Sequence, residues 1–390
     1  MYSERMSAVK SSAIRDILKL MSRPGMISFA GGLPAPELFP VREIAAAADA
    51  VLKKYGAAAL QYSVTEGILP LREKIAAMLD PAGNQLSTEN VIITQGSQQA
   101  LDLLSKVFID NGSAVLTENP TYLGALQAFQ LFQANVTAVP SDNNGIDTTL
   151  LKKHLKQDKP RLVYVMPNFQ NPTGLTYQLE RRKELAKLAQ EHDVIFIEDD
   201  PYGGLRFEGE RLPSLFALAE GKNVVYLSSF SKTIAPGLRI AYAAGDAELL
   251  KKLVIAKQGT DLQTNTFGQY IVNEYLENGL YQKHVDLVTR TYRERRDAML
   301  RSFERHFPAS ASWNKPAGGM FFWVRLADEV DTSALLMQCA EQNVAFVPGK
   351  EFFPDGSGRN TMRLNFTNAT LPEIEEGIKR LGKVLKGAGV

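Results

Sequence analysis

Residues 224–242 read VVYLSSFSKTIAPGLRIAY, and this stretch joins a strand-like run to a group of reactive side chains. The opening run, VVYL, is typical of a buried strand. Serines follow it, then Lys232, and seven residues later Arg239. A lysine held among apolar walls has a lowered pKa, and its neutral amine is then a usable nucleophile. We therefore expect Lys232 to lie at the tip of a strand, where it can take part in chemistry.

Strands and helices alternate around this stretch, from about residue 70 to residue 245. Short apolar runs such as NVIIT (90–94), RLVYVM (161–166) and DVIFIE (193–198) are separated by segments in which leucines fall on one helical face. Alternation of this kind predicts an α/β fold, with a mostly parallel sheet between layers of helices. Strands and helices mix in the last part of the chain, which predicts a second, smaller α+β domain.

The chain is expected to divide into two domains. Residues 1–45 are predicted to form an N-terminal segment that belongs to the small domain and covers the pocket. Residues 46–285 would form the large domain, and residues 286–390 the remainder of the small one. A chain of 390 residues is long enough to supply a core for both.

The composition is that of an ordinary globular protein, with 45% hydrophobic and 22% charged residues. A formal net charge of +1 argues against a nucleic-acid partner, because such proteins usually show a basic excess. One cysteine, Cys339, and four scattered histidines show no metal-ligand spacing, so no metal site is expected. No apolar run reaches the roughly 18 residues of a membrane span and no signal peptide is recognisable, which predicts a cytoplasmic enzyme without a membrane partner.

Polar side chains follow five of the predicted strands. In open α/β sheets a ligand binds outside the carboxyl ends of the strands, so residues at these ends meet in one place. The segments concerned are Gly96-Ser97-Gln98, Asn119 to Tyr122, Asn168 to Gly174, Asp199 to Tyr202, and Ser229 to Lys232. Five such ends together predict a single site.

Two of these segments indicate the kind of ligand. TQGSQQAL, residues 94–101, places small and polar residues where a strand gives way to a helix, and the N–H groups of a helix start bind phosphate-like anions. An amine from Lys232 beside a phosphate suggests a Schiff base to a phosphorylated aldehyde, and pyridoxal 5'-phosphate (PLP) fits. The acids of VIFIEDDPY, residues 194–202, could then keep the ring nitrogen of PLP protonated.

The chain resembles the PLP-dependent aminotransferases of fold type I, class I/II, and is most similar to the group that contains 2-aminoadipate and kynurenine aminotransferases. The resemblance runs through nearly the whole chain, from SSAIRDILKL and ISFAGGLPAPELFP to MRLNF. Its most specific motifs are PNFQNPTG, EDDPY and SFSKTIAPGLR, in this order. It implies the large and small domains of PLP fold type I, and a homodimer with shared active sites.

The resemblance also implies a role for each matching residue. Lys232 corresponds to the lysine that forms the internal aldimine and then moves the substrate proton. Asp199 corresponds to the aspartate paired with the pyridine nitrogen, and Tyr122 to the aromatic residue stacked on the ring; these three are the expected catalytic residues. The other implied cofactor ligands are Asn171 and Tyr202 at the ring oxygen, Ser97, Gln98, Ser229, Ser231 and Arg239 at the phosphate, and Tyr62 at the phosphate of the neighbouring subunit's cofactor.

Substrate contacts are implied in the same way. Arg363, helped by Asn171, matches the clamp on the substrate α-carboxylate, and Gly32 lies in a loop that lines the pocket. Arg15 falls off the apolar face of a short helical pattern in SSAIRDILKL and is expected to meet a distal carboxylate.

The implied reaction moves the α-amino group of an L-amino acid, of the 2-aminoadipate, aromatic or branched-chain type, to 2-oxoglutarate in two ping-pong half-reactions. A PLP-dependent β-lyase or decarboxylase on the same fold stays open as the alternative, because the cofactor performs the chemistry and the pocket selects the bond that breaks.

Overall fold

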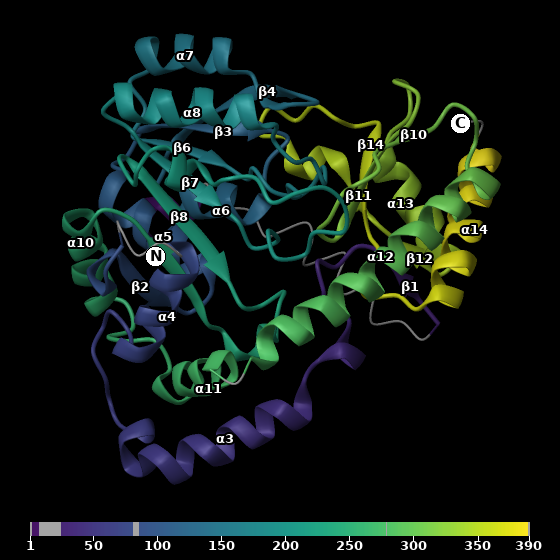
Figure 1. The fold of residues 1–390 in the computed structure, drawn as a ribbon. Helices are drawn as coiled ribbons and strands as arrows, with labels where there is room; N and C mark the ends of the chain where they lie inside the picture. Colours follow the sequence, from purple (N-terminus) through teal and green to yellow (C-terminus); the bar gives the residue numbers. More distant parts are fainter. Residues whose placement is uncertain (1, 8–24, 81–85, 278, 389–390) are drawn as a thin grey trace.

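The computed structural model describes residues 2–7, 25–80, 86–277 and 279–388 (Figure 1). The helices in these ranges are α1 Glu4–Ser7, α3 Val41–Tyr55, α4 Leu69–Leu79, α5 Ser97–Phe108, α6 Leu123–Leu131, α7 Thr148–Gln157, α8 Leu179–Glu191, α9 Leu215–Leu218, α10 Ala247–Gln258, α11 Thr266–Glu277, α12 Leu280–His306, α13 Thr332–Glu341 and α14 Leu371–Gly387. Over the same ranges, none of the helices is both long enough and apolar enough to cross a membrane.

The strands include every apolar run that the sequence singles out. They are β1 Ile27–Ser28, β2 Val91–Thr94, β3 Ala114–Asn119, β4 Asn135–Asp142, β5 Gly145–Ile146, β6 Leu162–Val165, β7 Ile195–Asp199, β8 Val224–Ser229, β9 Ala241–Ala244, β10 Ser312–Trp313, β11 Phe321–Arg325, β12 Val344–Ala345, β13 Val347–Pro348 and β14 Thr361–Asn365. Strand β4 is not expected from the sequence, because Pro140 interrupts its apolar run and only Val139 among its residues is buried.

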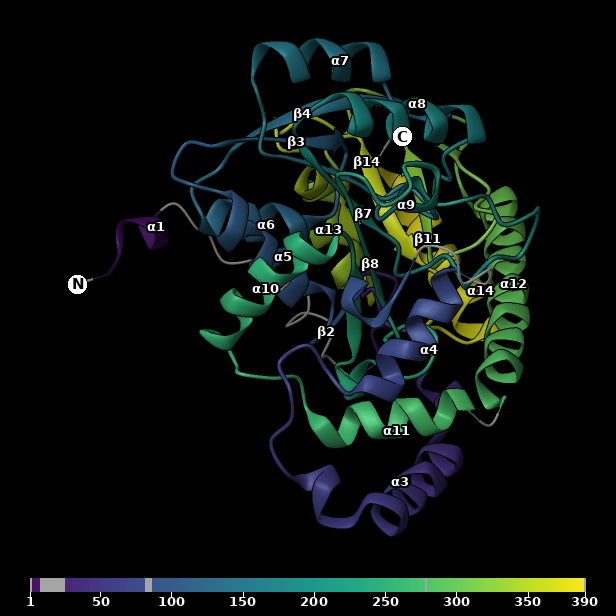
Figure 2. The same ribbon diagram turned by 60° about the vertical axis from the view of Figure 1, so that its left-hand side comes forward.

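An eight-stranded sheet forms the centre of the molecule, in the order β2-β9-β8-β7-β6-β3-β4-β5. The five strands from β8 to β4 run parallel to one another, whereas β9 is antiparallel to β2 and β8, and β5 to β4. Helices cover both faces: α5, α6 and α10 contribute to one hydrophobic core and α4, α7, α8 and α11 to the other (Figures 1 and 2). The predicted α/β class with a mostly parallel sheet is therefore confirmed.

Side chains alternate between the two faces along the central strands, and this decides which of them can meet. In β6, Tyr164 belongs to the core on the α5 side, whereas Val163 belongs to the core on the α8 side. In β7, Ile197 and Phe196 divide in the same manner. Because the period along a strand is two residues, Asp199 lies on the same face as Ile197 and Tyr164.

A four-stranded antiparallel sheet, in the order β10-β11-β14-β13, forms the smaller α+β part with α13 and α14. Strand β1 pairs parallel with β12 through Ile27 and Val344, so the N-terminal region contacts the C-terminal part of the chain. The long helix α12 runs from the large sheet towards the smaller one (Figure 1). The expected boundary at residue 285 falls inside α12, and the division at residues 45 and 285 stays a prediction.

Candidate active site

A cavity of about 320 Å³ lies at the carboxyl ends of the parallel strands. Residues that follow β2, β3, β6, β7 and β8 line it, together with a glycine of the N-terminal loop and an arginine of β14. The predicted residues on its wall are Gly32, Ser97, Gln98, Tyr122, Asn171, Asp199, Tyr202, Ser229, Ser231, Lys232, Arg239 and Arg363. The five strand ends therefore meet in one place, as their sequence predicts.

Lys232 lies just beyond the end of β8 and is mostly buried. Its Nζ donates a hydrogen bond to the carbonyl oxygen of Gly32, at 2.7 Å. Burial lowers the pKa of Lys232 to about 8, and the positive charges of Arg363 and Arg239 act in the same direction. At neutral pH on the order of a tenth of a lysine with this pKa is neutral, against less than roughly a thousandth of an ordinary lysine. A nucleophilic amine is thus present in the cavity without any external base.

Asp199 ends β7 and is 2% exposed. Its Oδ2 accepts a hydrogen bond from the hydroxyl of Tyr164 at 2.8 Å, and its Oδ1 has no partner among the described residues. Burial raises the pKa of Asp199 to about 7, against the hydrogen bond from Tyr164, while the charge of Asp200 raises it further. A cationic N–H group in the cavity would satisfy Oδ1 and bring the carboxyl group back to its charged form.

The two acids beside Asp199 point to the opposite face of the sheet. Asp200 Oδ2 accepts a hydrogen bond from the hydroxyl of Tyr226 at 2.9 Å, and Glu198 Oε2 accepts one from the backbone N–H of Phe216 at 2.9 Å. Burial raises the pKa of both carboxyl groups. Of the three neighbouring acids, Asp199 alone is a wall residue of this cavity.

Arg363 lies in the middle of β14 and is 3% exposed. Its Nη1 donates to Asn171 Oδ1 at 2.7 Å and its Nη2 to the carbonyl oxygen of Ala30 at 2.6 Å, and its guanidinium lies 4.3 Å from the ring centre of Phe321. Both hydrogen-bond partners are neutral, so the charge is poorly compensated, and burial lowers the pKa of Arg363 to about 10. A carboxylate is the ligand that such a buried guanidinium binds best.

A small basic recess, which we call the cup, lies between the turn that joins β2 to α5, Arg239, and the pair Ser229 and Ser231. Gly96 has φ +82°, and a Cβ atom there would lie 2.2 Å from Arg239 Nη2, so only glycine allows the guanidinium to come this close. The hydroxyl of Ser97, the first residue of α5, is buried and has no partner among the described residues. Across the cup, the hydroxyls of Ser229 and Ser231 bond each other at 2.8 Å. Hydroxyl donors, helix N–H groups and a guanidinium together suit a phosphate.

Two tyrosines give the cavity its aromatic wall. Burial raises the pKa values of Tyr122 and Tyr202, so both hydroxyls stay protonated near neutral pH. Tyr202 meets Phe321 edge to face, with ring centres 5.8 Å apart. A Cβ atom at Gly124 would lie 2.5 Å from the hydroxyl end of Tyr122, so this glycine leaves the tyrosine its place.

The chain matches a known protein family over most of its length. The family model described as aminotransferase class I and II matches residues 11–381. The chain belongs to this family. The 2-aminoadipate transaminase of Thermus thermophilus is 47% identical over 382 residues, which cover 97% of this chain and 95% of that protein. Aromatic-amino-acid aminotransferase 1 of Thermococcus litoralis is 44% identical over 391 residues, which cover 99% of this chain and 94% of that protein.

A solved structure extends the likeness to the cofactor. The crystal structure of the α-aminoadipate aminotransferase LysN from Thermus thermophilus contains N-(5'-phosphopyridoxyl)-L-leucine. It matches this chain with a TM-score of 0.93 and 45% identity, over 100% of this chain and 98% of that one. The protein is therefore an aminotransferase of PLP fold type I that uses PLP, as its sequence predicts.

The side chains of this aminotransferase fit PLP. The unpartnered Oδ1 of Asp199 suits a pyridinium N–H, and the unpartnered hydroxyl of Ser97 suits a phosphate oxygen. Arg239 adds the charge that a phosphate needs, and Lys232 supplies an amine to an aldehyde. When bound, PLP supplies a ring that withdraws the electron pair released at the substrate Cα.

Tyr62, a predicted ligand of the cofactor, is not on the described wall of this cavity. Tyr62 is 78% exposed on the surface of the described chain. Arg15 lies outside the described residues, so its predicted contact stays a prediction.

The sequence alone missed the hydrogen-bond partner of Asp199 and, separately, three residues of the cavity wall. Tyr164 sits inside the apolar run RLVYVM, which reads as core, although its hydroxyl bonds Asp199. The signal that could have found Tyr164 is the two-residue alternation of side chains along strands. Tyr164 pairs in register with Ile197, two residues before Asp199, so its side chain lies on the same face as Asp199. The missed residues on the wall are Met166, Pro201 and Pro236.

Proposed function

We propose that this aminotransferase moves the α-amino group of an L-amino acid, of the 2-aminoadipate, aromatic or branched-chain type, to 2-oxoglutarate in two half-reactions. The observation that carries the proposal is the presence of Lys232 and Arg363 in one cavity: an amine of lowered pKa beside a buried cation with neutral partners. An amino acid and a 2-oxo acid share an α-carboxylate, and one guanidinium serves both.

Each of the cofactor residues would hold one part of PLP. Asp199 would keep the proton on the ring nitrogen, and Tyr122 would contact the ring. Asn171 and Tyr202 would bond the ring oxygen. The residues proposed for the phosphate are Ser97, Gln98, Ser229, Ser231 and Arg239. Anchoring the phosphate would fix the reacting carbon within reach of Lys232, which is an orientation effect.

Lys232 then serves as the base for the substrate Cα proton. With the cofactor bound, its amine would hold the proton removed from the substrate Cα, a role that the lowered pKa favours. Arg363, with Asn171, holds the α-carboxylate so that the Cα–H bond faces the amine. Gly32, whose carbonyl bonds Lys232, lines the substrate side of the cavity.

The names of the relatives support the range of donors. A 2-aminoadipate transaminase and an aromatic-amino-acid aminotransferase are both more than 40% identical to this chain. The matched crystal structure contains a leucine adduct. A donor panel with PLP and 2-oxoglutarate tests the proposal, and glutamate is the expected product. Pyruvate and ammonia without glutamate would instead indicate a β-lyase.

Substitution of Arg363 with lysine is expected to raise the KM for every amino acid and every 2-oxo acid by similar factors, roughly 10- to 100-fold. A lysine cannot copy the bidentate grip of a guanidinium on a carboxylate. Steady-state kinetics with three donors and two acceptors measure this. Arg359→Lys, at an exposed arginine paired with Asp331, is the control and should change little. An effect of Arg363→Lys on one substrate alone would argue against a role at the shared carboxylate.

Arg15 is proposed to bind the distal carboxylate of acidic substrates from a segment that covers the pocket. What supports a substrate contact from the N-terminal region is that the carbonyl oxygen of Ala30 accepts from Arg363 and that of Gly32 from Lys232. An arginine that approaches 2-oxoglutarate and withdraws from an apolar donor would serve both substrates.

Arg15→Ala is expected to weaken the half-reactions of 2-aminoadipate, glutamate and 2-oxoglutarate by about 1–3 kcal/mol, the scale of a charge-assisted hydrogen bond. Leucine and aromatic donors should lose little, because they carry no distal carboxylate. Pre-steady-state measurements of each half-reaction separate the two groups. Equal losses for glutamate and leucine would contradict the proposal.

A homodimer is proposed as well, with Tyr62 reaching the cofactor phosphate of the neighbouring subunit. Apolar side chains are unusually exposed around it: Leu60 is 68%, Val64 54% and Leu262 57% exposed. A hydrogen bond from the backbone N–H of Ser63 to Gln263 holds these segments side by side. A patch of this kind suits a protein partner, here a second copy of the chain. Analytical ultracentrifugation that finds only monomer at micromolar concentration would exclude the dimer.

A further inference from the structure

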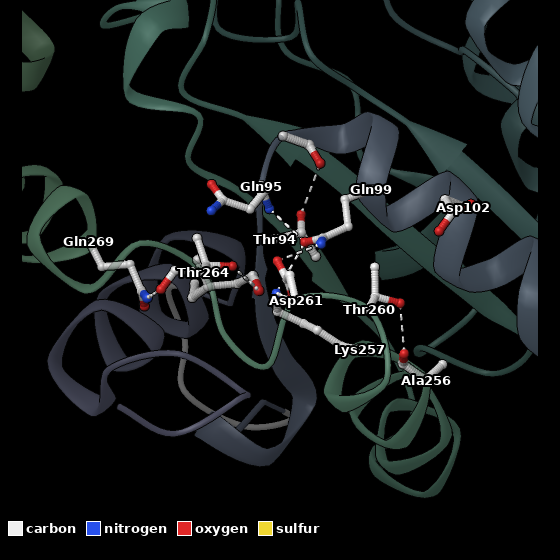
Figure 3. Close-up of polar contacts among 12 residues, drawn as sticks. Thr94, Gln95, Gln99, Asp102, Ala256, Lys257, Thr260, Asp261, Thr264 and Gln269 are labelled. Atoms are coloured by element: carbon white, nitrogen blue, oxygen red, sulfur yellow. Dashed lines mark hydrogen bonds and ion pairs between the residues drawn. The ribbon is translucent and has the colours of Figure 1, made fainter. Parts of the chain in front are cut away.

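Behind the turn between β2 and α5, three side chains close a ring of hydrogen bonds (Figure 3). Lys257, in the last turn of α10, donates to Asp261 Oδ1 at 2.6 Å and to Gln99 Oε1 at 3.1 Å. Gln99 Nε2 in turn donates to Asp261 Oδ2 at 2.7 Å. Each of the three thus contacts the other two, and we call them the Gln99 ring.

The Gln99 ring reaches the backbone of the turn through one hydrogen bond. Gln99 Oε1 accepts from the backbone N–H of Gln95 at 2.8 Å, while the carbonyl oxygen of the same Gln95 accepts from Arg239 Nη2 at 3.2 Å. Gln99 therefore holds the backbone N–H of Gln95, and the guanidinium of Arg239 holds its carbonyl oxygen. Ser97, two residues on, presents its unpartnered hydroxyl to the cavity.

The far side of the ring is firmly attached to the large sheet. Thr264, which follows Asp261 closely, donates its hydroxyl to the carbonyl oxygen of Ile93 in β2 at 3.1 Å. Gln269 donates to the carbonyl oxygen of Thr264 at 2.8 Å (Figure 3). It also accepts from the backbone N–H of Ile68 at 2.9 Å. The segment that carries Asp261 can therefore act as a fixed support.

Lys257 is the buried member of the ring, with a side chain that is 0% exposed, whereas Asp261 is 23% exposed. Burial lowers the pKa of Lys257, and the hydrogen bond and charge of Asp261 oppose this shift. A buried ammonium needs such partners, because an uncompensated charge is costly away from water. Removing Lys257 would take one donor from Gln99 Oε1 and one from Asp261 Oδ1, so the ring would open.

We propose that Lys257 is a positioning residue for the cofactor phosphate, which acts through Gln99 by fixing the turn at Gln95. This inference rests on the proposed place of the phosphate between Ser97 and Arg239. Lys257 does not line the cavity, so its effect would come from the shape of the cup and would be absent for a ligand without a phosphate.

The test compares PLP with pyridoxal, which has the aldehyde but no phosphate. Dissociation constants for both are measured by titration of the apoprotein. Lys257→Met is expected to weaken PLP binding roughly tenfold or more and to change pyridoxal binding by less than about twofold. Lys106→Met is the matched control: Lys106 lies on the same helix as Gln99 and bonds Thr260, but it does not touch the ring. It should leave both constants unchanged.

Asp261→Asn separates positioning from a simple effect of charge. If Lys257 attracts the phosphate through space, removal of the nearby negative charge should tighten PLP binding. Positioning predicts weaker binding, because Asp261→Asn also opens the ring. The variant keeps the shape of the side chain, so it also serves if Lys257→Met does not fold. Tighter PLP binding in Asp261→Asn would overturn the proposal.

Three further variants complete the design. Gln99→Leu should lower PLP affinity as Lys257→Met does, and the double variant should be no worse than Gln99→Leu, because Lys257 acts through Gln99. Additive losses, or equal losses for PLP and pyridoxal in Lys257→Met, would overturn the proposal.

Arg239→Met tests the phosphate site itself. If Arg239→Met shows no selective loss of PLP affinity, the proposed phosphate site fails. If Arg239→Met shows this loss and Lys257→Met does not, only the positioning role of Lys257 fails.

Discussion

Substitution of Lys232 with alanine is expected to abolish amino transfer, with a loss of turnover of roughly 10⁴-fold or more. The amine at this position is the only one on the described wall of the cavity, and its lowered pKa is what makes it a base near neutral pH. The proposed phosphate contacts of Ser97 and Arg239 would be untouched, so PLP should still bind. Glutamate formation from 2-oxoglutarate and the PLP content after gel filtration measure the two effects separately.

Lys232→Arg is the matched control for this prediction. Arginine keeps the positive charge and the approximate length, but it stays protonated in proteins and offers no neutral amine. It should therefore be as inactive as alanine. Turnover in Lys232→Arg without turnover in Lys232→Ala would mean that Lys232 acts as a fixed charge, and near-normal turnover in Lys232→Ala would remove the central claim.

The position of the site could be predicted from the sequence because strand ends carry a strong local signal. Lys232, Asp199 and Ser97 each follow a short apolar run, and the parallel order of the strands brings such positions to one edge of the sheet. The fold class follows from the same alternation of strand and helix. Arg363 is different: its strand MRLNF gives no local sign of a carboxylate site, and only the resemblance to a known family pointed to it.

The supporting contacts could not be predicted, because their partners are distant in the sequence. Tyr164 lies 35 residues from Asp199, and Lys257 lies 158 residues from Gln99. A tyrosine in an apolar strand reads as core, and a lysine near the end of an amphipathic helix reads as a surface residue. Only the packing of α10 against the turn shows that Lys257 is buried.

Substitution of Asp199 with asparagine is expected to slow both half-reactions by on the order of 100- to 1000-fold, the usual loss when one group that stabilises developing charge is removed. The amide has nearly the same shape and can keep its contact with Tyr164. It is neutral, so it does not hold a proton on the ring nitrogen, and the ring withdraws electrons less strongly. Single-turnover absorbance measurements give the rates, and circular dichroism checks that the fold is intact.

Asp200→Asn makes the same chemical change one residue away and on the opposite face of the sheet. There the carboxylate bonds Tyr226 and lies outside the cofactor cavity, so the half-reactions should change little. Tyr164→Phe should fall between the two, because it removes the donor at Asp199 Oδ2 and leaves the charge in place. The ranking of the three rate losses therefore distinguishes a charge beside the cofactor ring from general damage to the sheet. Such damage would affect both aspartate variants alike. A silent Asp199→Asn with a damaging Asp200→Asn would show that the other carboxylate faces the ring.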